Sequence, residues 1–193
     1  MPQIARESLL SLEAYARSRS EIRARAIDHK RQRTVHLGEH LTLQFEDELT
    51  VRYQIQEMLR IERIFEEEGI RSELDAYNPL IPDGSNWKAT MLLEYPDADE
   101  RRQRLAELRG IERRVWVQVE GCERVPAIAD EDLERENDEK TSSVHFLRFE
   151  LRPEMIAAMR RGAGLSMGVD HPRYQASAQI DPRTRSSLAE DLA

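Results

Sequence analysis

The spacing of apolar side chains predicts a long helix near the start of the chain. Residues 4–32 contain no glycine and no proline, and apolar side chains recur there at helical intervals. These side chains are Leu9, Leu12, Tyr15, Ala16, Ile22 and Ala26. Residues 34–37 and 41–45 instead alternate around Gly38, which predicts a short hairpin or two extended segments.

The helical period returns over residues 47–68, with Asp47 as the predicted N-cap and Gly69 after the predicted end. One carboxylate interrupts the apolar face of this helix. At about 100° per residue, Glu62 lies about 20° from Val51, inside the apolar arc. A charge at such a position must be paired, protonated or bound to a ligand. Glu62 is therefore the candidate catalytic carboxylate.

From Trp87 onward the pattern changes to short alternating segments separated by helices. The predicted strands are residues 87–95, 114–120, 123–128, 144–151 and 165–169. Helices are predicted at 97–108 and 153–161. These elements indicate an α+β fold: a mainly antiparallel sheet of about five strands, faced by helices and preceded by the long N-terminal helix.

Composition sharpens the domain picture. The chain has 193 residues, 39% of them hydrophobic, which is enough for one main core. We expect a basic N-terminal helix at 1–33, a single α+β core domain at 34–171 and a flexible C-terminal tail at 172–193, where the sequence is polar and weakly patterned.

Charge and hydropathy limit the partners. The charged fraction of 34% and mean hydropathy of -0.69 predict a soluble chain, and the sequence shows neither a membrane-length apolar run nor a signal peptide. We therefore expect a cytoplasmic protein without membrane contact.

The net charge of -8 is unevenly distributed, because residues 1–33 carry eight basic side chains against four acidic ones. Without aromatic interleaving, this basic helix argues against nucleic-acid binding. The acidic run 130–139 is interpreted as a hydrated loop.

Several sequence patterns typical of catalytic or cofactor-binding sites do not have the structural context that those sites require. The segment 164–168 spells the Gly-x-Ser-x-Gly nucleophile elbow, but it follows a predicted helix and enters a strand, which is the reverse of the required order. Its glycines also miss the dinucleotide fingerprint, so no dinucleotide cofactor is expected. Cys122 is the single cysteine, which excludes an intrachain disulfide and a four-cysteine iron-sulfur cluster held by one chain.

A metal bound by histidine and carboxylate stays open. His36 and His40 bracket Gly38 and could converge at a turn, while Asp170 and His171 lie together at a strand end. His145 completes the set of candidate ligands. Histidines scattered through a domain of this size are more often surface or hydrogen-bonded core residues, so the spacing permits a metal site without diagnosing one.

Three longer phrases carry a family resemblance. Residues 41–63, 73–82 and 144–151 read LTLQFEDELTVRYQIQEMLRIER, ELDAYNPLIP and VHFLRFEL. They resemble an uncharacterised bacterial family catalogued as a domain of unknown function, and the likeness extends over nearly all of the chain up to Tyr174. Members of that family are often encoded beside rubrerythrin and an iron-sulfur oxidoreductase of the heterodisulfide-reductase type. The resemblance therefore implies a redox or peroxide-stress setting, but no catalytic residue.

Two hypotheses follow. The first, which we favour, is a non-catalytic accessory or binding protein that docks onto a redox partner, either rubrerythrin or the iron-sulfur oxidoreductase. The second is a small metal- or ligand-dependent enzyme with a pocket around Glu62. Its further lining would be Tyr53, Arg60, Tyr77, Asn78 and His145.

Two questions remain open at this level. Glu62 could instead simply neutralise a buried arginine such as Arg148. The long amphipathic helices could also pair between two copies, which makes a homodimer a candidate assembly.

Overall fold

The structure is a computed structural model that describes residues 3–129 and 140–193. These residues form an α+β fold with two antiparallel sheets, which confirms the predicted class. The helices are η1 (Arg6–Ser8), α1 (Leu12–Arg31), α2 (Glu48–Ile61), α3 (Glu67–Tyr77), η2 (Asn78–Leu80), α4 (Ala98–Glu107), η3 (Ile111–Arg114), α5 (Pro153–Arg160) and α6 (Pro182–Ala189). The strands are β1 (Thr34–Leu37), β2 (Leu41–Phe45), β3 (Asn86–Leu93), β4 (Val115–Val119), β5 (Val125–Pro126), β6 (Ile128–Ala129), β7 (Val144–Glu150), β8 (Leu165–His171) and β9 (Tyr174–Gln179). The predicted acidic loop 130–139 lies outside the described residues.

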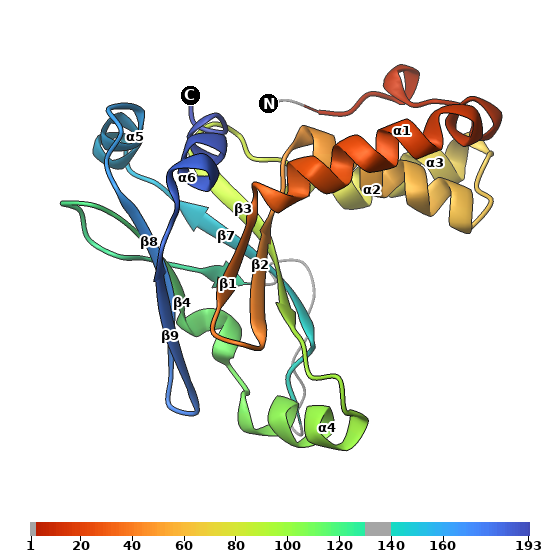
Figure 1. Ribbon diagram of the computed structural model, residues 1–193. Coiled ribbons are helices and arrows are strands. Elements are labelled where there is room, and N and C mark those ends of the chain that lie inside the picture. The colour runs from red at the N-terminus through yellow and green to blue at the C-terminus, as the bar shows by residue number, and fades with distance from the viewer. Residues whose placement is uncertain (1–2, 130–139) are drawn as a thin grey trace.

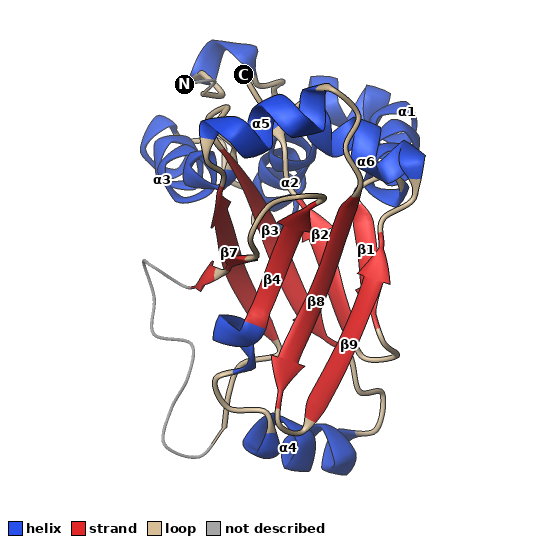
Figure 2. Ribbon diagram, turned by 90° about the vertical axis from the view of Figure 1, so that its left-hand side faces the viewer, coloured by secondary structure: helices blue, strands red, loops and turns tan. Residues whose placement is uncertain are grey.

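The strands divide into two sheets that pack face to face as a sandwich, with α5 and α6 at one end and α4 at the other (Figure 2). One sheet has the order β1-β2-β3-β7-β6 and the other β5-β4-β8-β9. Alternating side chains of each strand point between the sheets, as a half-buried strand requires. In β2, for example, Leu41, Leu43 and Phe45 are all at most 1% exposed.

Both open edges of the sandwich are tied together. On one side, the Tyr174 hydroxyl donates to the Leu37 carbonyl at 2.6 Å and accepts from the His40 amide at 3.0 Å. This contact occurs at the β1–β2 turn, where Gly38 has φ +73°. On the other side, β5 pairs with β4 while β6, after one intervening residue, pairs with β7. The strand predicted at 123–128 therefore leaves one sheet and joins the other.

Helices α1, α2 and α3 form an arm that projects from the sandwich (Figure 1). The arm has its own buried apolar cluster, which includes Val51, Ile55 and Leu59 of α2 and Ile70 and Leu74 of α3. A second and larger cluster fills the space between the sheets. The prediction of one main core therefore corresponds to two buried clusters, one in each part of the molecule.

The predicted helix 47–68 is two helices. Asp47 is the N-cap, as predicted, but α2 ends at Ile61 with Glu62 as the C-cap. Arg63 adopts φ +55°, and the Ile64 amide donates to the Leu59 carbonyl at 2.9 Å. This is a Schellman ending with arginine, rather than glycine, in the left-handed position. Ile64, which follows the break, still packs against the arm cluster. The apolar pattern in the sequence therefore runs across the break and gave the impression of one helix.

Two other boundaries differ from the sequence prediction. The first helix starts at Leu12, because the Ser11 hydroxyl accepts from the Ala14 amide at 3.2 Å and caps it there. The prediction of a flexible tail from residue 172 is wrong, since these residues form β9 and α6. Leu188 of α6 is fully buried, and its carbonyl accepts from the Trp87 indole at 2.8 Å. An Asp181 cap followed by proline was the sequence signal for this helix.

Arg33 joins the arm, the sandwich and the C-terminal helix. It is 1% exposed, and its guanidinium donates to the carbonyls of Phe45 at 3.2 Å, Glu46 at 3.1 Å and Ser187 at 3.1 Å. It also forms a 2.5 Å ion pair with Asp191. Almost every donor of this buried cation is therefore engaged, as burial of a charge requires.

A second ionic contact holds α1 against α2. Glu57 accepts from the Tyr15 hydroxyl at 2.7 Å and from Arg19 at 2.8 Å through both carboxylate oxygens. The hydrogen bonds from Arg19 lower the pKa of Glu57 to about 2, even though burial opposes this shift.

Replacing Arg33 should destabilise the whole junction. For Arg33→Met we expect a loss of about 3–5 kcal/mol in the free energy of unfolding, because Asp191 keeps a buried charge without its partner. Urea denaturation would measure the loss. The double variant Arg33→Met, Asp191→Asn should recover part of the stability, and no recovery would contradict the assigned pairing.

Glu57→Gln should make stability less dependent on acid. At pH 7 we expect a loss of about 1–2 kcal/mol, since the ionised acceptor for Arg19 is gone. Because the folded pKa of Glu57 is about 2 against a usual 4.5, its contribution is complete above the usual value and disappears as the pH falls towards 2. The gap between wild type and variant should therefore close at low pH. Glu68→Gln, exposed on α3, serves as control and should change stability little at either pH.

Candidate functional site

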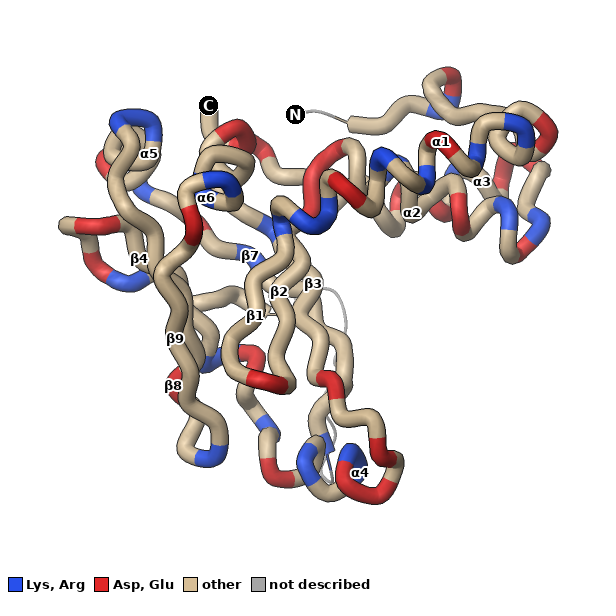
Figure 3. The backbone as a smooth tube through the Cα atoms, viewed as in Figure 1, with Lys and Arg blue, Asp and Glu red and all other residues tan. Residues whose placement is uncertain are grey.

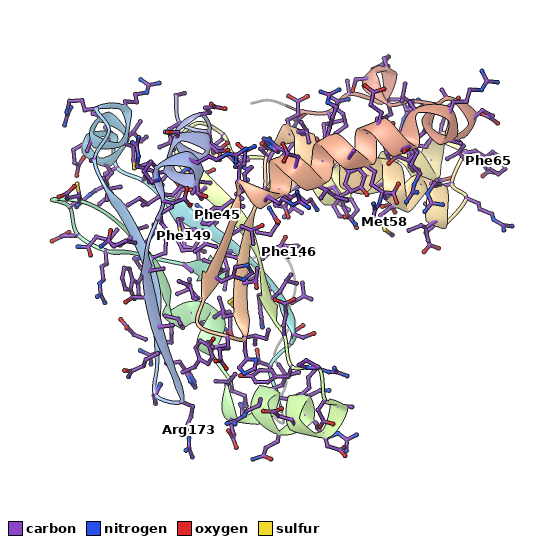
Figure 4. All side chains as sticks on the ribbon, in the orientation of Figure 1. Phe45, Met58, Phe65, Phe146, Phe149 and Arg173 are labelled. Atoms are coloured by element: carbon purple, nitrogen blue, oxygen red, sulfur yellow. The ribbon has the colours of Figure 1, made fainter. Side chains whose placement is uncertain are left out.

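A groove of about 340 Å³ lies in the angle between the arm and the outer face of the five-stranded sheet. Figure 4 shows Phe146 in this angle, on the opposite side of its sheet from Phe45 and Phe149, which point between the sheets. The floor consists of side chains from β2, β3 and β7, and the wall of side chains from the arm. Its lining is Lys30, Thr42, Gln44, Glu46, Val51, Gln54, Tyr77, Leu80, Thr90, Leu92, Val144 and Phe146.

Strand register assembles the floor. The alternation that turns Leu41, Leu43 and Phe45 inward turns the intervening side chains outward. One row across the sheet is Gln44, Thr90 and Phe146, and the neighbouring row is Thr42, Leu92 and Val144. The floor is therefore polar over β2 and apolar over β7.

Glu46 is the carboxylate of the groove. It follows β2 directly and is 9% exposed. The Thr90 hydroxyl donates to its Oε1 at 2.7 Å and the Thr50 hydroxyl donates to its Oε2 at 2.5 Å. These two contacts hold the side chain between the sheet and the first turn of α2.

Glu46 has no cationic partner among the described residues. Lys88 lies beside it across the sheet, but the Lys88 ammonium donates to the Pro79 carbonyl. Lys30 also lines the groove, but its Nζ lies 5.7 Å from the centre of the Tyr53 ring and forms no ion pair with Glu46. Arg33 contacts only the backbone carbonyl of Glu46. Among the described residues, this buried carboxylate thus has two hydroxyl donors beside the cavity and no neutralising side chain.

This arrangement suits a small organic molecule. A carboxylate can accept about four hydrogen bonds, and the two threonines supply two of them. Val51, Leu80, Leu92 and Val144 provide apolar surface beside it. A few convergent polar groups within an apolar wall are the usual composition of a ligand site.

The structure does not gather the predicted pocket around Glu62. The Glu62 side chain is exposed at the end of α2, so the prediction that it sits buried in the apolar face is wrong, and it does not neutralise Arg148, which pairs with Glu150. Glu62 is the C-cap of α2, and the preceding residue, Ile61, is also exposed. Of its proposed companions, Tyr77 lines the Glu46 groove.

The other four predicted lining residues lie apart. Tyr53 lines a separate hollow between α1 and α2. Arg60 is paired with Glu57, and Asn78 bonds both backbone groups of Ile4. His145 is fully buried inside the sandwich, where its Nε2 lies 2.9 Å from the Thr141 hydroxyl.

The candidate metal ligands are dispersed as well. His36 contacts the Thr42 hydroxyl at 3.1 Å, His40 stacks on Tyr95 with ring centres 4.2 Å apart, and His171 bonds the Arg109 carbonyl at 3.1 Å. Asp170 is ion-paired with Arg124 at 2.7 Å. Within residues 3–129 and 140–193, no three histidine, cysteine or acidic side chains come close enough together to hold a metal.

A wider cleft of about 670 Å³ lies between the start of α2 and the C-terminus. Its charges largely satisfy one another: Arg33 pairs with Asp191, Arg52 with Glu48, and Asp47 with His29. Burial raises the pKa of Asp191 to about 6, against the opposing pull of Arg33. Because the ion pairs named above already occupy most of its charged groups, this cleft is a weaker candidate than the groove at Glu46.

The sequence offered one overlooked signal for Glu46. The polar positions Thr42, Gln44 and Glu46 alternate with the apolar ones of β2, so they share a face. That face forms the floor of a groove only because β3 and β7 pair beside β2 and the arm covers one end. The sequence of β2 alone predicts neither contact.

The family described as "Protein of unknown function (DUF3501)" matches residues 3–192. The chain belongs to this family. A crystal structure described as a novel protein of unknown function from Burkholderia pseudomallei K96243 is 57% identical, covers 100% of both chains and superposes with a TM-score of 0.95. None of the curated proteins compared with the sequence matches it. In the described part of the chain, no helix has the length and apolar character that crossing a membrane requires.

Proposed function

We propose that this DUF3501 protein is a binding protein that takes a small organic molecule in the Glu46 groove. The observation that carries this proposal is a buried carboxylate that lines a partly apolar cavity and has no neutralising cation in the described part of the chain. Such a group raises the free energy of the empty site. A ligand that bonds to Glu46 and covers the apolar wall lowers it.

The groove favours binding over catalysis. Glu46 accepts hydrogen bonds from two threonine hydroxyls, and the described lining of the groove contains no histidine or second carboxylate of the kind that paired acid–base chemistry uses. The pocket proposed around Glu62 has lost its central residue to solvent. The geometry of the groove therefore supports a non-catalytic binding role for a small ligand, which differs from the docking onto a redox partner that the first hypothesis from the sequence proposes.

A second role is favoured by the far end of the arm. Leu10, Ile61 and Phe65 are 41%, 58% and 72% exposed. Leu10 and Phe65 line one shallow hollow, and Figure 4 shows Phe65 at the end of the arm remote from the sheets. We call these three side chains the arm tip. Exposed apolar side chains that cluster in this way commonly mark protein interfaces.

We therefore also propose that the arm tip docks onto a protein partner. The resemblance described above supplies the class of partner, a rubrerythrin or an iron-sulfur oxidoreductase, by association alone. A second copy of the chain, which would give the homodimer, is the competing occupant of the same surface.

Blocking the groove should abolish ligand binding. A small-molecule library screened by thermal shift should contain compounds that stabilise the wild type. At 100 times Kd, binding contributes about 2.7 kcal/mol, which corresponds to roughly 5–10 °C in Tm for a chain of this size. Val144→Trp fills the groove and should remove these shifts, whereas Gln175→Trp, exposed on β9, should retain them. Equal shifts in all three proteins, or no stabilising compound at all, would contradict the proposal.

Removing the arm tip should abolish docking without unfolding the protein. Ile61→Ser with Phe65→Ser should change stability by no more than about 0.5 kcal/mol per site, because both side chains are exposed. Size-exclusion chromatography with purified rubrerythrin or iron-sulfur oxidoreductase would detect the complex. Ile128→Ser, which removes an exposed apolar side chain from the sandwich, is the matched control. Co-elution that survives the double variant would sink this role, and a wild type that elutes at twice its mass would assign the tip to the homodimer.

A further inference from the structure

We infer that the ligand of the Glu46 groove is an organic cation: an ammonium group, which bonds to Glu46, on a small apolar body. This inference rests on the proposed binding function and adds the chemical class of the ligand. Four features of the groove carry it: the unused acceptor capacity of Glu46, the engagement of nearby cations elsewhere, the apolar wall and the volume.

The acceptor capacity is directional. Each carboxylate oxygen of Glu46 receives one hydroxyl hydrogen, from Thr90 on one side and from Thr50 on the other. About two of its four lone-pair positions remain. A ligand group at this place must therefore donate hydrogen bonds, and an anionic or purely accepting group would be repelled.

The charge favours a cation over a neutral donor. Lys88 is held by the Pro79 carbonyl, Arg148 by Glu150 and Arg33 by Asp191 with backbone carbonyls. These three cations therefore bond to other groups, and none of them forms an ion pair with the Glu46 carboxylate. Hydrogen bonds to an ionised group in a protein interior are about twice as strong as neutral ones, so an ammonium gains more here than a hydroxyl does.

The apolar wall fixes the rest of the ligand. Leu92 and Val144 adjoin the polar part of the floor, and Val51 of α2 and Leu80 of η2 complete the apolar lining. Tyr77 adds a ring to the same wall. A volume of about 340 Å³ is at the small end of ligand sites and suits a compact molecule with one polar end.

Lys30 limits the position of the ammonium. Its charge lies in the same lining, so a cation bound beside Lys30 would be repelled more strongly than one whose ammonium bonds directly to Glu46. Removing the Lys30 charge should consequently leave cation binding intact or strengthen it slightly. Loss of the Lys30 charge therefore serves as a control, because loss of the Glu46 charge should instead weaken binding of the cation.

The test compares two probes of equal size, phenethylammonium and 2-phenylethanol, by isothermal titration calorimetry on the full chain. We expect phenethylammonium to bind the wild type at least about tenfold more tightly than the alcohol. Glu46→Gln keeps the shape and an acceptor for one threonine, and it should weaken phenethylammonium by about 10- to 100-fold while changing the alcohol less than about threefold. Lys30→Met should leave phenethylammonium binding unchanged or slightly tighter.

The outcomes distinguish failure of this inference from failure of the proposed binding function. If ammonium and alcohol bind equally, or if Lys30→Met weakens the ammonium as much as Glu46→Gln does, the inference is overturned. Library compounds that are anionic or neutral and whose binding Val144→Trp abolishes would likewise overturn it, while leaving the groove as a binding site. Failure of every compound to bind would overturn the inference and the proposed function together.

Discussion

The structure depends on the burial of one cation, Arg33. Its guanidinium lies where the end of α1, the end of β2 and the C-terminal helix α6 meet, and it is almost fully enclosed. Three carbonyls and the Asp191 carboxylate receive its hydrogen bonds. A buried charge is tolerated only when it is satisfied in this way, so these elements are held to one relative placement.

That placement also positions the groove. Arg33 donates to the carbonyls of Phe45 and Glu46, the two residues at which the chain leaves the sheet and enters α2. With this backbone fixed, the Glu46 side chain lies on the outer face of the sheet, between Thr90 of β3 and Thr50 of α2. The contact that joins the arm to the sandwich is therefore the contact that sets the geometry of the candidate site.

The two parts of the molecule carry charge differently. In Figure 3, the basic and acidic residues are concentrated along the helices and connecting loops, and the strands carry few. The arm accordingly combines a charged surface, a small apolar cluster and an apolar tip, whereas the sandwich offers a sparsely charged face. This division assigns the two proposed roles to separate surfaces: a small ligand at the junction and a protein partner at the tip.

The sequence by itself determined the local elements. Alternation in residues 34–37 and 41–45 predicted β1 and β2, the Asp47 cap predicted the start of α2, and the helices predicted at 97–108 and 153–161 are α4 and α5. These features follow from side-chain periodicity and from short-range hydrogen bonds, which depend on neighbours in the chain. The α+β class followed from the same local patterns.

Tertiary structure alone decided which carboxylate faces a cavity. Periodicity placed Glu62 on an apolar face, but Glu62 is the C-cap at the exposed end of α2, where Ile61 is also 58% exposed. Glu46 was an unremarked residue before a helix cap until β3, β7 and the arm enclosed it. The order of residues 172–193 was decided likewise, since α6 is fixed by Trp87 and Arg33, which are distant in sequence. Burial is a property of what packs against a residue, and local sequence does not contain that information.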